Sequence, residues 1–333
     1  MPGFALSFIV AFLLAVAVMP VVIALSKKLK LRQTILHYVD NHSQKSGTPT
    51  MGGVGIMIAL AVSSLCIMKS NHSLALLVLL VTLAYGIIGF LDDFIKVYFK
   101  QNKGLSPWQK ILFQVVVAII VSVYAYYNDY IGDSLFVPFT LGEISLGVFA
   151  VPLYIVVFLA LTNSVNLTDG LDGLASKVTA AYTASFAAIV ALIIALFGDG
   201  QAFAAEYENI LIFCTALIGA LIGFLCFNGY PAKVFMGDTG ALALGGALAC
   251  LAVVTKLTLM VPILGIMYVL TSLSDIIQVL YYKKTKKRVF LMAPLHHHFE
   301  RKGVHENRIV TVYTAVTAMV GVLSILIIAA VNF

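Results

Sequence analysis

Long stretches without a charged side chain constrain this chain more than any other feature of its sequence. One of them, LALLVLLVTLAYGIIGFL, runs from Leu74 to Leu91 before the first charge appears at Asp92. A helix needs roughly 20 mostly apolar residues to cross the hydrocarbon core of a bilayer. Apolar residues make up 61% of the chain and charged residues 11%, whereas soluble domains carry about a quarter charged residues. The sequence therefore predicts an integral membrane protein.

Runs of this kind recur along the whole sequence. None of them alternates as barrel strands do, so helices are expected. We predict an all-α polytopic integral membrane protein of about ten transmembrane helices, with residues 1–333 forming a single membrane-embedded domain. The expected spans are Gly3–Leu25, Gly52–Met68, Leu74–Leu91, Trp108–Tyr127, Gly147–Leu161, Val178–Phe197, Ile210–Phe227, Gly240–Thr255, Leu259–Tyr282 and Ile309–Val331.

Positive charge is concentrated on alternate loops between these spans. If the N-terminus lies outside, 19 of the 21 lysines and arginines fall on the inner side, and only Lys69 and Lys256 lie outside. Cytoplasmic loops carry such an excess, so both termini are expected outside. The net charge of +6 then reflects topology, and no nucleic-acid partner is expected. The outer segment Asn128–Leu146 alternates weakly and could form a small extracytoplasmic β-hairpin.

Acidic side chains gather at the predicted cytosolic ends of the helices. Asp92 and Asp93 are expected to end the third helix, where the helix dipole opposes negative charge. Asp169 and Asp172 lie in the expected loop Asn163–Ala175, and a further acid follows in the next inner loop. Each acid alone could be a solvated helix terminus, but together, beside several glycines, they favour a functional site on the cytosolic side.

The last loop of this group, Asn228–Gly240, contributes Asp238, and the ninth helix contributes Asp275 with Gln278 one turn later. Mg²⁺ prefers one or two carboxylates together with phosphate oxygens and water. Lys96 and Lys110 lie nearby in the sequence, and metal plus lysine is the mixture that neutralises a transferred phosphoryl group. The four cysteines are scattered singly, so no zinc site competes.

The run PLHHHFE, Pro294 to Glu300, is the last unusual stretch. Three consecutive histidines on a helix point about 100° apart, so His296, His297 and His298 cannot all bind one metal. The run is either a polar loop or a lid whose imidazoles contact phosphate, ribose or base.

Taken together, these motifs resemble a known family. GFLDDFIK, NSVNLTDGLDGLA, FMGDTG and PLHHHFE are similar to motifs of the phospho-N-acetylmuramoyl-pentapeptide transferases, a branch of the polyprenyl-phosphate N-acetylhexosamine-1-phosphate transferases. The similarity extends over essentially the whole chain and includes KSGTPTMGG in the first inner loop. The Asp-rich motifs are shared across the superfamily, whereas TPTMGG and PLHHHFE are more specific to the muramoyl branch.

The resemblance implies a reaction and an architecture. UDP-MurNAc-pentapeptide and undecaprenyl phosphate would give lipid I and UMP, with Mg²⁺, at the cytosolic face of a bacterial inner membrane. The family fold implies ten helices, a homodimer, a cytosolic catalytic cleft, and a bent ninth helix beside a lipid groove. Pro262 and Gly265 in this sequence suit such a bend.

The resemblance also implies roles for individual residues. Asp92, Asp93, Asp169 and Asp238 match residues essential for activity, and Asp238 matches the metal ligand, with Asp169 as a second candidate. Phe235 would stack on the uracil. The positions matched around the nucleoside and diphosphate are Lys45, Thr50, Gly170, Leu171, Asp172, Asn228, Phe235, Gln278 and His297, and the same motifs add Asn163, Asn166, His296 and His298 as substrate-binding candidates.

Two alternatives remain open from the sequence. One is a sister enzyme that moves GlcNAc-1-phosphate to the same lipid, although PLHHHFE argues against it. The other is an ion-coupled transporter, but transporter sites lie near the membrane midplane and often show repeat symmetry, which this sequence lacks. Direct attack by the lipid phosphate and a two-step route through an aspartyl phosphate would use the same residues.

Overall fold

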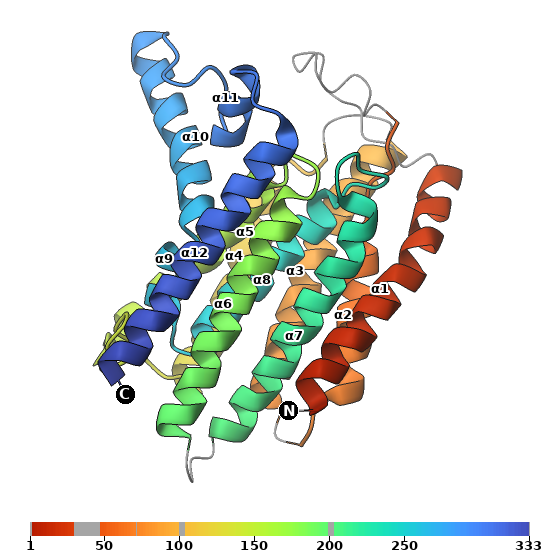
Figure 1. The fold of residues 1–333 in the computed structure, drawn as a ribbon. Helices are drawn as coiled ribbons and strands as arrows, with labels where there is room; N and C mark the ends of the chain where they lie inside the picture. Colours follow the sequence, from red (N-terminus) through yellow and green to blue (C-terminus); the bar gives the residue numbers. More distant parts are fainter. Residues whose placement is uncertain (1, 30–46, 71, 100–103, 199–202, 333) are drawn as a thin grey trace.

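The protein is a bundle of long helices that run roughly along one direction (Figure 1). The computed structural model describes residues 2–29, 47–70, 72–99, 104–198 and 203–332. The first half of the bundle consists of α1 (Pro2–Lys28), α2 (Gly53–Ile67), α3 (Ser73–Tyr98), α4 (Pro107–Tyr127), α5 (Ala150–Thr168) and α6 (Leu174–Phe197). The second half consists of α7 (Phe203–Asn228), α8 (Gly237–Val254), α9 (Val261–Leu264), α10 (Ile266–Thr285), α11 (Leu295–Arg301) and α12 (Glu306–Asn332).

The helices confirm an all-α polytopic membrane protein. Within the described residues, eight helices are long and apolar enough to cross a membrane, and a bent helix pair would make a ninth. A further apolar helix, α2, has 15 residues and is shorter than a usual span. The count of ten spans stays a prediction.

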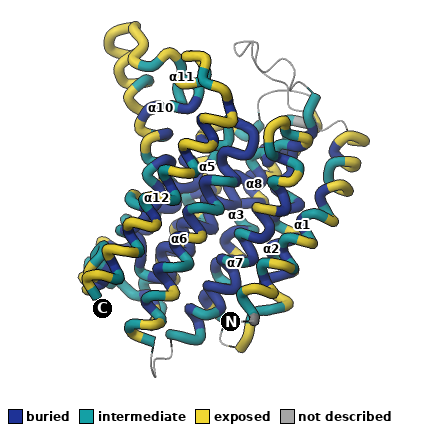
Figure 2. The backbone as a smooth tube through the Cα atoms, in the orientation of Figure 1, coloured by how far each residue is buried: buried dark blue, intermediate teal, exposed yellow. Residues whose placement is uncertain are grey.

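Helix α8 forms the centre of the bundle. It packs against α2, α3 and α5, and every residue from Thr239 to Val254 is buried. Figure 2 shows this buried core, with exposed positions gathered on the outer helices. The sequence GALALGGALACLAVV explains the position, because its small residues let neighbouring helices approach closely. The first turn of α8 is thereby held firmly against α3.

The expected bend in the ninth span is confirmed. Residues Thr258–Leu264 and Ile266–Thr285 form two helical pieces at 78° to each other, broken at Gly265. Beyond the break, α10 diverges from the bundle and leads to α11 at one end of the molecule (Figure 1). Many of its apolar side chains are exposed, among them Ile276 and Leu280.

The two ends of the chain lie at the opposite end of the bundle from α11 (Figure 1). Near the C-terminal end of α12, β1 (Ser134–Phe136) and β2 (Glu143–Ser145) pair antiparallel, with Leu135 opposite Ile144 (Figure 1). This small ribbon falls within the segment in which a hairpin was expected. Its location outside the cell, like that of the termini, stays a prediction.

Candidate active site

Asp92 and Asp93 lie within α3, not at its end. The helix was expected to stop at Leu91, but it continues to Tyr98. Phe94 stacks on Phe90 and on Tyr98 with ring centroids about one helical turn apart, so the aromatic side chains at i, i+4 spacing support the extra turns. The two aspartates are therefore on a regular helix, which fixes the directions of their side chains.

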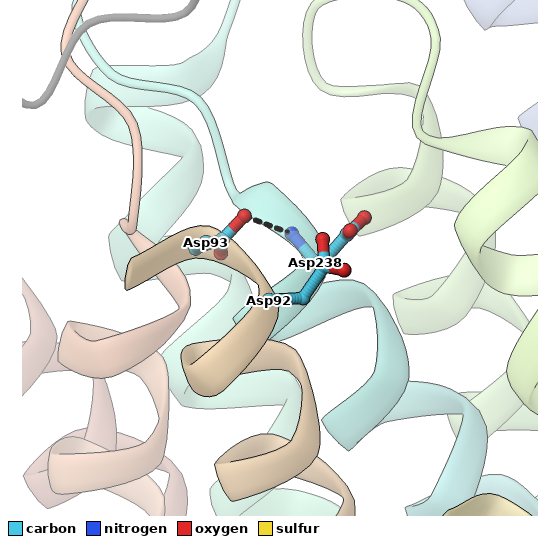
Figure 3. A group of neighbouring side chains, drawn as sticks. All are labelled: Asp92, Asp93 and Asp238. Atoms are coloured by element: carbon cyan, nitrogen blue, oxygen red, sulfur yellow. Dashed lines mark hydrogen bonds between the residues drawn. The ribbon is translucent and has the colours of Figure 1, made fainter. Parts of the chain in front are cut away.

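Asp93 binds the first turn of α8. Its Oδ2 accepts hydrogen bonds from the backbone N–H of Thr239 at 2.9 Å and from the Thr239 hydroxyl at 2.6 Å. Its Oδ1 accepts the backbone N–H of Asp238 at 3.2 Å, the interaction drawn in Figure 3. These N–H groups have no partner inside their own helix, so Asp93 acts as the N-terminal cap of α8 from another helix. Gly237, with φ +75°, permits this approach, because a Cβ there would lie 2.6 Å from Asp93 Oδ2.

Asp238 consequently lies in the first helical turn, not in a loop before it. The eighth helix was expected to start at Gly240 but begins at Gly237, because Asp93 supplies the cap that the local sequence lacks. The carboxylates of Asp92, Asp93 and Asp238 converge from α3 and α8 (Figure 3). One oxygen from each lies within 4.8 Å of the others.

Two lysines neutralise part of this negative charge. Lys96 Nζ lies 2.6 Å from Asp92 Oδ2 and 2.7 Å from Asp238 Oδ2. Lys110 Nζ lies 2.8 Å from Asp238 Oδ2 and 3.5 Å from Asp92 Oδ2. Both lysines remain partly exposed whereas Asp92 is buried, so the ammonium groups form the open side of the cluster. Three carboxylates and two ammonium groups thus meet at one point.

Local structure at the start of α4 brings Lys110 to this point. Ser106 caps the helix through a capping box with Gln109, and Pro107 occupies the first helical position. Just before the cap, the backbone N–H of Leu105 donates to Asp92 Oδ1 at 2.9 Å. The Asp92 carboxylate therefore holds the entry of α4, and one turn later the chain presents Lys110.

The donor set fits a hard divalent cation. Carboxylate oxygens are the protein ligands that Mg²⁺ prefers. Asp93 is engaged on both oxygens by α8, so Asp92 and Asp238 are the two members of the group best placed to hold a metal. The two ammonium groups occupy the same oxygens that a cation would use.

Asp169 is close to this group without belonging to it. It ends α5, and its half-buried carboxyl has a pKa raised well above its usual range, first by burial and then by the nearby charges of Asp238 and Asp93. Asn163 and Asn166 were expected in a loop but lie inside α5, which continues to Thr168. The Asn163 amide donates to Gln114 and to the Leu159 carbonyl, both at 2.8 Å.

The predicted nucleotide-binding residues lie in two adjoining loops. Asp172 and Leu171, both buried, follow α5. Asp172 Oδ2 accepts the N–H of Ala232 at 2.9 Å, and the Asn228 amide donates to the Val234 carbonyl at 2.9 Å. The loop between α7 and α8 is thereby fixed just before Phe235.

The segment around Thr50 pairs with this second loop. The N–H of Phe235 donates to the Pro49 carbonyl at 2.8 Å, and the N–H of Gly52 donates to the Phe235 carbonyl at 2.9 Å. The Phe235 side chain remains partly exposed, as a stacking platform must. Lys45, the remaining candidate in this stretch, lies outside the described residues.

The histidine run is a short helix, α11, and not a loop. His296 is buried and lies against Gly170, where a Cβ would come 2.3 Å from its Nε2. His297 Nδ1 lies 2.9 Å from Glu300. His298 Nδ1 accepts the N–H of Leu291 at 3.1 Å, so this ring orders the preceding loop.

Gln278 also orders that loop. Its Oε1 accepts the N–H groups of Val289 at 3.1 Å and Phe290 at 2.9 Å. The structure therefore gives Gln278 and His298 a role in folding the segment between α10 and α11, in addition to any contact with a substrate.

Sequence reasoning missed two residues that organise the site. Thr239 belongs to the FMGDTG motif, and its place after Asp238 could have marked it as a capping contact. Glu306, at the start of α12, is buried and its carboxylate accepts the N–H of Asp172 at 2.5 Å. The local sequence around Glu306 does not indicate this contact, because Asp172 is 134 residues away in the chain.

Comparison with known proteins adds a separate line of information. The model of the family described as Glycosyl transferase family 4 matches residues 75–256. A phospho-N-acetylmuramoyl-pentapeptide-transferase of Clostridium kluyveri is 43% identical over 323 residues, covering 96% of this chain and 98% of the relative. A protein of the same name from Clostridioides difficile is 40% identical over 319 residues, covering 96% of this chain and 95% of the relative. Another from Clostridium botulinum is 42% identical over 312 residues, covering 93% of this chain and 92% of the relative.

Proposed function

The chain belongs to the phospho-N-acetylmuramoyl-pentapeptide transferases of glycosyl transferase family 4, membrane enzymes of bacterial peptidoglycan synthesis, and from this premise we propose its reaction. The enzyme transfers phospho-N-acetylmuramoyl-pentapeptide from UDP-MurNAc-pentapeptide to undecaprenyl phosphate. The products are lipid I and UMP, and the reaction depends on Mg²⁺.

One observation carries this proposal: the cluster of Asp92, Asp238, Lys96 and Lys110 at one end of the helix bundle. A soluble nucleotide and a lipid whose phosphate lies at the membrane surface can meet only at such an end. Carboxylates that hold a divalent cation, together with ammonium groups, supply the charge that a diphosphate needs. By the distribution of lysine and arginine, this end faces the cytoplasm.

Mg²⁺, held by Asp92 and Asp238 and supplemented by Asp169, would supply charge neutralisation for the diphosphate. The chain's own residues would do the rest. Lys96 and Lys110 exchange their carboxylate partners for phosphate oxygens as substrate enters. Their partial exposure leaves the ammonium groups free to reorient, and their positive charge offsets the repulsion between the aspartates and an anionic substrate.

The chemical step is direct attack by the lipid phosphate. This monoester has a second pKa of about 6, so at neutral pH it is largely a dianion and needs no strong base. One of its oxygens forms a bond to the β-phosphorus, the bond from that phosphorus to the bridging oxygen breaks, and UMP leaves with the electron pair. The hydrogen bonds of Asp93 support this route, because a carboxylate that caps α8 through both oxygens is poorly suited to be a nucleophile.

The nucleotide side of the site is formed by the loops at Asp172 and Phe235. The partly exposed ring of Phe235 stacks on the uracil, and His297 and Gln278 lie at the diphosphate. We further expect ten membrane spans and a homodimer, as the family fold implies.

Incubation of purified protein with UDP-MurNAc-pentapeptide or UDP-GlcNAc, each with undecaprenyl phosphate and Mg²⁺, tests the proposal. We expect UMP release from the muramoyl nucleotide, a lipid-linked product, and loss of both when Mg²⁺ is chelated. Release from UDP-GlcNAc alone would assign the sister reaction, and no UMP from either nucleotide would refute the proposed function.

A further inference from the structure

Glu306 is a buried carboxylate that the proposed reaction does not use. It lies in the first turn of α12, where the helix dipole favours negative charge, and it is buried there. Its Oε1 accepts the backbone N–H of Asp172 at 2.5 Å. Burying a carboxylate is costly unless it is hydrogen-bonded, so this contact ties the start of α12 to the loop after α5.

The contact extends through Asp172 to a second loop. The Asp172 side chain accepts the N–H of Ala232 at 2.9 Å. In the same loop the Asn228 amide donates to the Val234 carbonyl at 2.9 Å, and Phe235 follows directly. Glu306 on α12 thus holds the loop after α5 through the Asp172 N–H. The Asp172 carboxylate in turn holds the segment that leads to Phe235.

A second contact joins the same two regions independently. His296 of α11 is buried against Gly170, so closely that a Cβ on this glycine would lie 2.3 Å from the ring. Gly170 and Asp172 are two residues apart, and α11 is followed by α12. The segment from α11 to the start of α12 therefore holds the loop after α5 at two neighbouring points.

We propose that Glu306 is a positioning residue for the nucleotide side of the active site. By accepting the Asp172 N–H, it sets the loop after α5 and, through Asp172, the loop that presents Phe235. The identity of the nucleotide rests on the proposed function, whereas the positioning of the two loops by Glu306 does not depend on it.

The kinetic test separates the two substrates. In Glu306→Ala we expect the KM for UDP-MurNAc-pentapeptide to rise about tenfold or more, the size expected from loss of one hydrogen bond to a charged group, while the KM for undecaprenyl phosphate stays unchanged. Glu306→Gln should largely restore the nucleotide KM, because an amide oxygen still accepts the N–H. The matched control is Asn307→Ala, an exposed neighbour on the same turn.

Three outcomes would overturn the proposal: Glu306→Ala behaving like Asn307→Ala, an equal rise in both KM values, or Glu306→Gln as impaired as Glu306→Ala. The last would show that charge matters and the hydrogen bond does not.

Amide hydrogen exchange without substrates supplies a readout besides activity. In Glu306→Ala, residues 170–173 and 230–235 should exchange faster than in the unchanged protein, while α7 stays the same. If this variant is not monodisperse in detergent, Glu306→Asp, one methylene shorter, serves instead. Unchanged exchange in both loops would overturn the positioning role even if the protein releases UMP, whereas faster exchange in a protein that releases no UMP would refute only the proposed function.

Discussion

The sharpest consequence of the site geometry is that Asp93 and Asp238, both essential by family resemblance, should respond differently to the same substitution. Asp93→Asn preserves shape but leaves one acceptor oxygen where there were two. If that oxygen faces Thr239, the amide nitrogen faces the N–H of Asp238, and a charge-assisted hydrogen bond is lost. Such bonds contribute about 1.5–3 kcal/mol each, and a charge at a helix N-terminus adds about 0.3–1 kcal/mol. The substitution should therefore cost about 2–4 kcal/mol of stability.

Asp238→Asn should behave in the opposite way. Its carboxylate contacts Lys96 and Lys110, and both ammonium groups also lie beside Asp92, so neither lysine is left without a carboxylate partner when Asp238 loses its charge. The change also relieves repulsion with Asp92. We expect Asp238→Asn to lose more than tenfold in turnover, since a metal contact is worth several kcal/mol, with little change in stability.

Thermal unfolding in detergent measures the difference. Cys214 and Cys250 are buried while Cys66 and Cys226 are exposed, so a thiol-reactive fluorophore added after the exposed thiols are blocked reports unfolding. The midpoint should fall by several degrees in Asp93→Asn and stay near that of the unchanged protein in Asp238→Asn. Equal midpoints in the two variants, or a lower one in Asp238→Asn, would refute the assignment of Asp93 as the cap of α8.

Three further predictions concern substrates, mechanism and pH. Phe235→Ala should weaken nucleotide binding by about 1–3 kcal/mol and leave the KM for undecaprenyl phosphate unchanged; equal losses for both substrates in steady-state kinetics would point to a folding defect. Lipid-free enzyme given labelled UDP-MurNAc-pentapeptide and Mg²⁺ should release no burst of UMP, and one UMP per active site together with protein-bound label would overturn direct attack. Burial and neighbouring carboxylates raise the pKa of Asp169. On acidification, Asp169 should therefore be protonated at a higher pH than an ordinary aspartate. Metal binding favours the ionised form, so the acid limb of the pH–rate profile should move to lower pH as Mg²⁺ is increased, and a limb independent of Mg²⁺ would exclude Asp169 as a ligand.

Several features of this protein follow from its sequence alone. The apolar runs predict an all-α membrane protein because a bilayer leaves the backbone few other ways to satisfy its hydrogen bonds. Gly265 and Pro262 predict the break in the ninth span because such residues interrupt the helical hydrogen-bond ladder. The Asp-rich motifs and PLHHHFE indicate the family, and the full-length relatives support the same assignment.

The sequence did not predict where the helices that carry the site begin and end. Apolar length predicts where a helix leaves lipid, not where it stops, so α3 continues past Asp92 and Asp93 and α5 past Asn163. The start of α8 at Gly237 depends on a cap from Asp93, 145 residues before Asp238 in the chain. No local pattern contains such a partner.

The division of labour among the carboxylates was decided by tertiary structure. In the sequence, Asp92 and Asp93 are equivalent neighbours. On a regular helix adjacent side chains point about 100° apart, so Asp92 meets two lysines and Asp93 meets the first turn of α8. Glu306 acquires its role in the same way, because packing brings the Asp172 N–H, 134 residues away in the chain, to its carboxylate. The sequence determined which chemical groups are present, and the packing of distant helices decided which of them face the substrate and which hold the others in place.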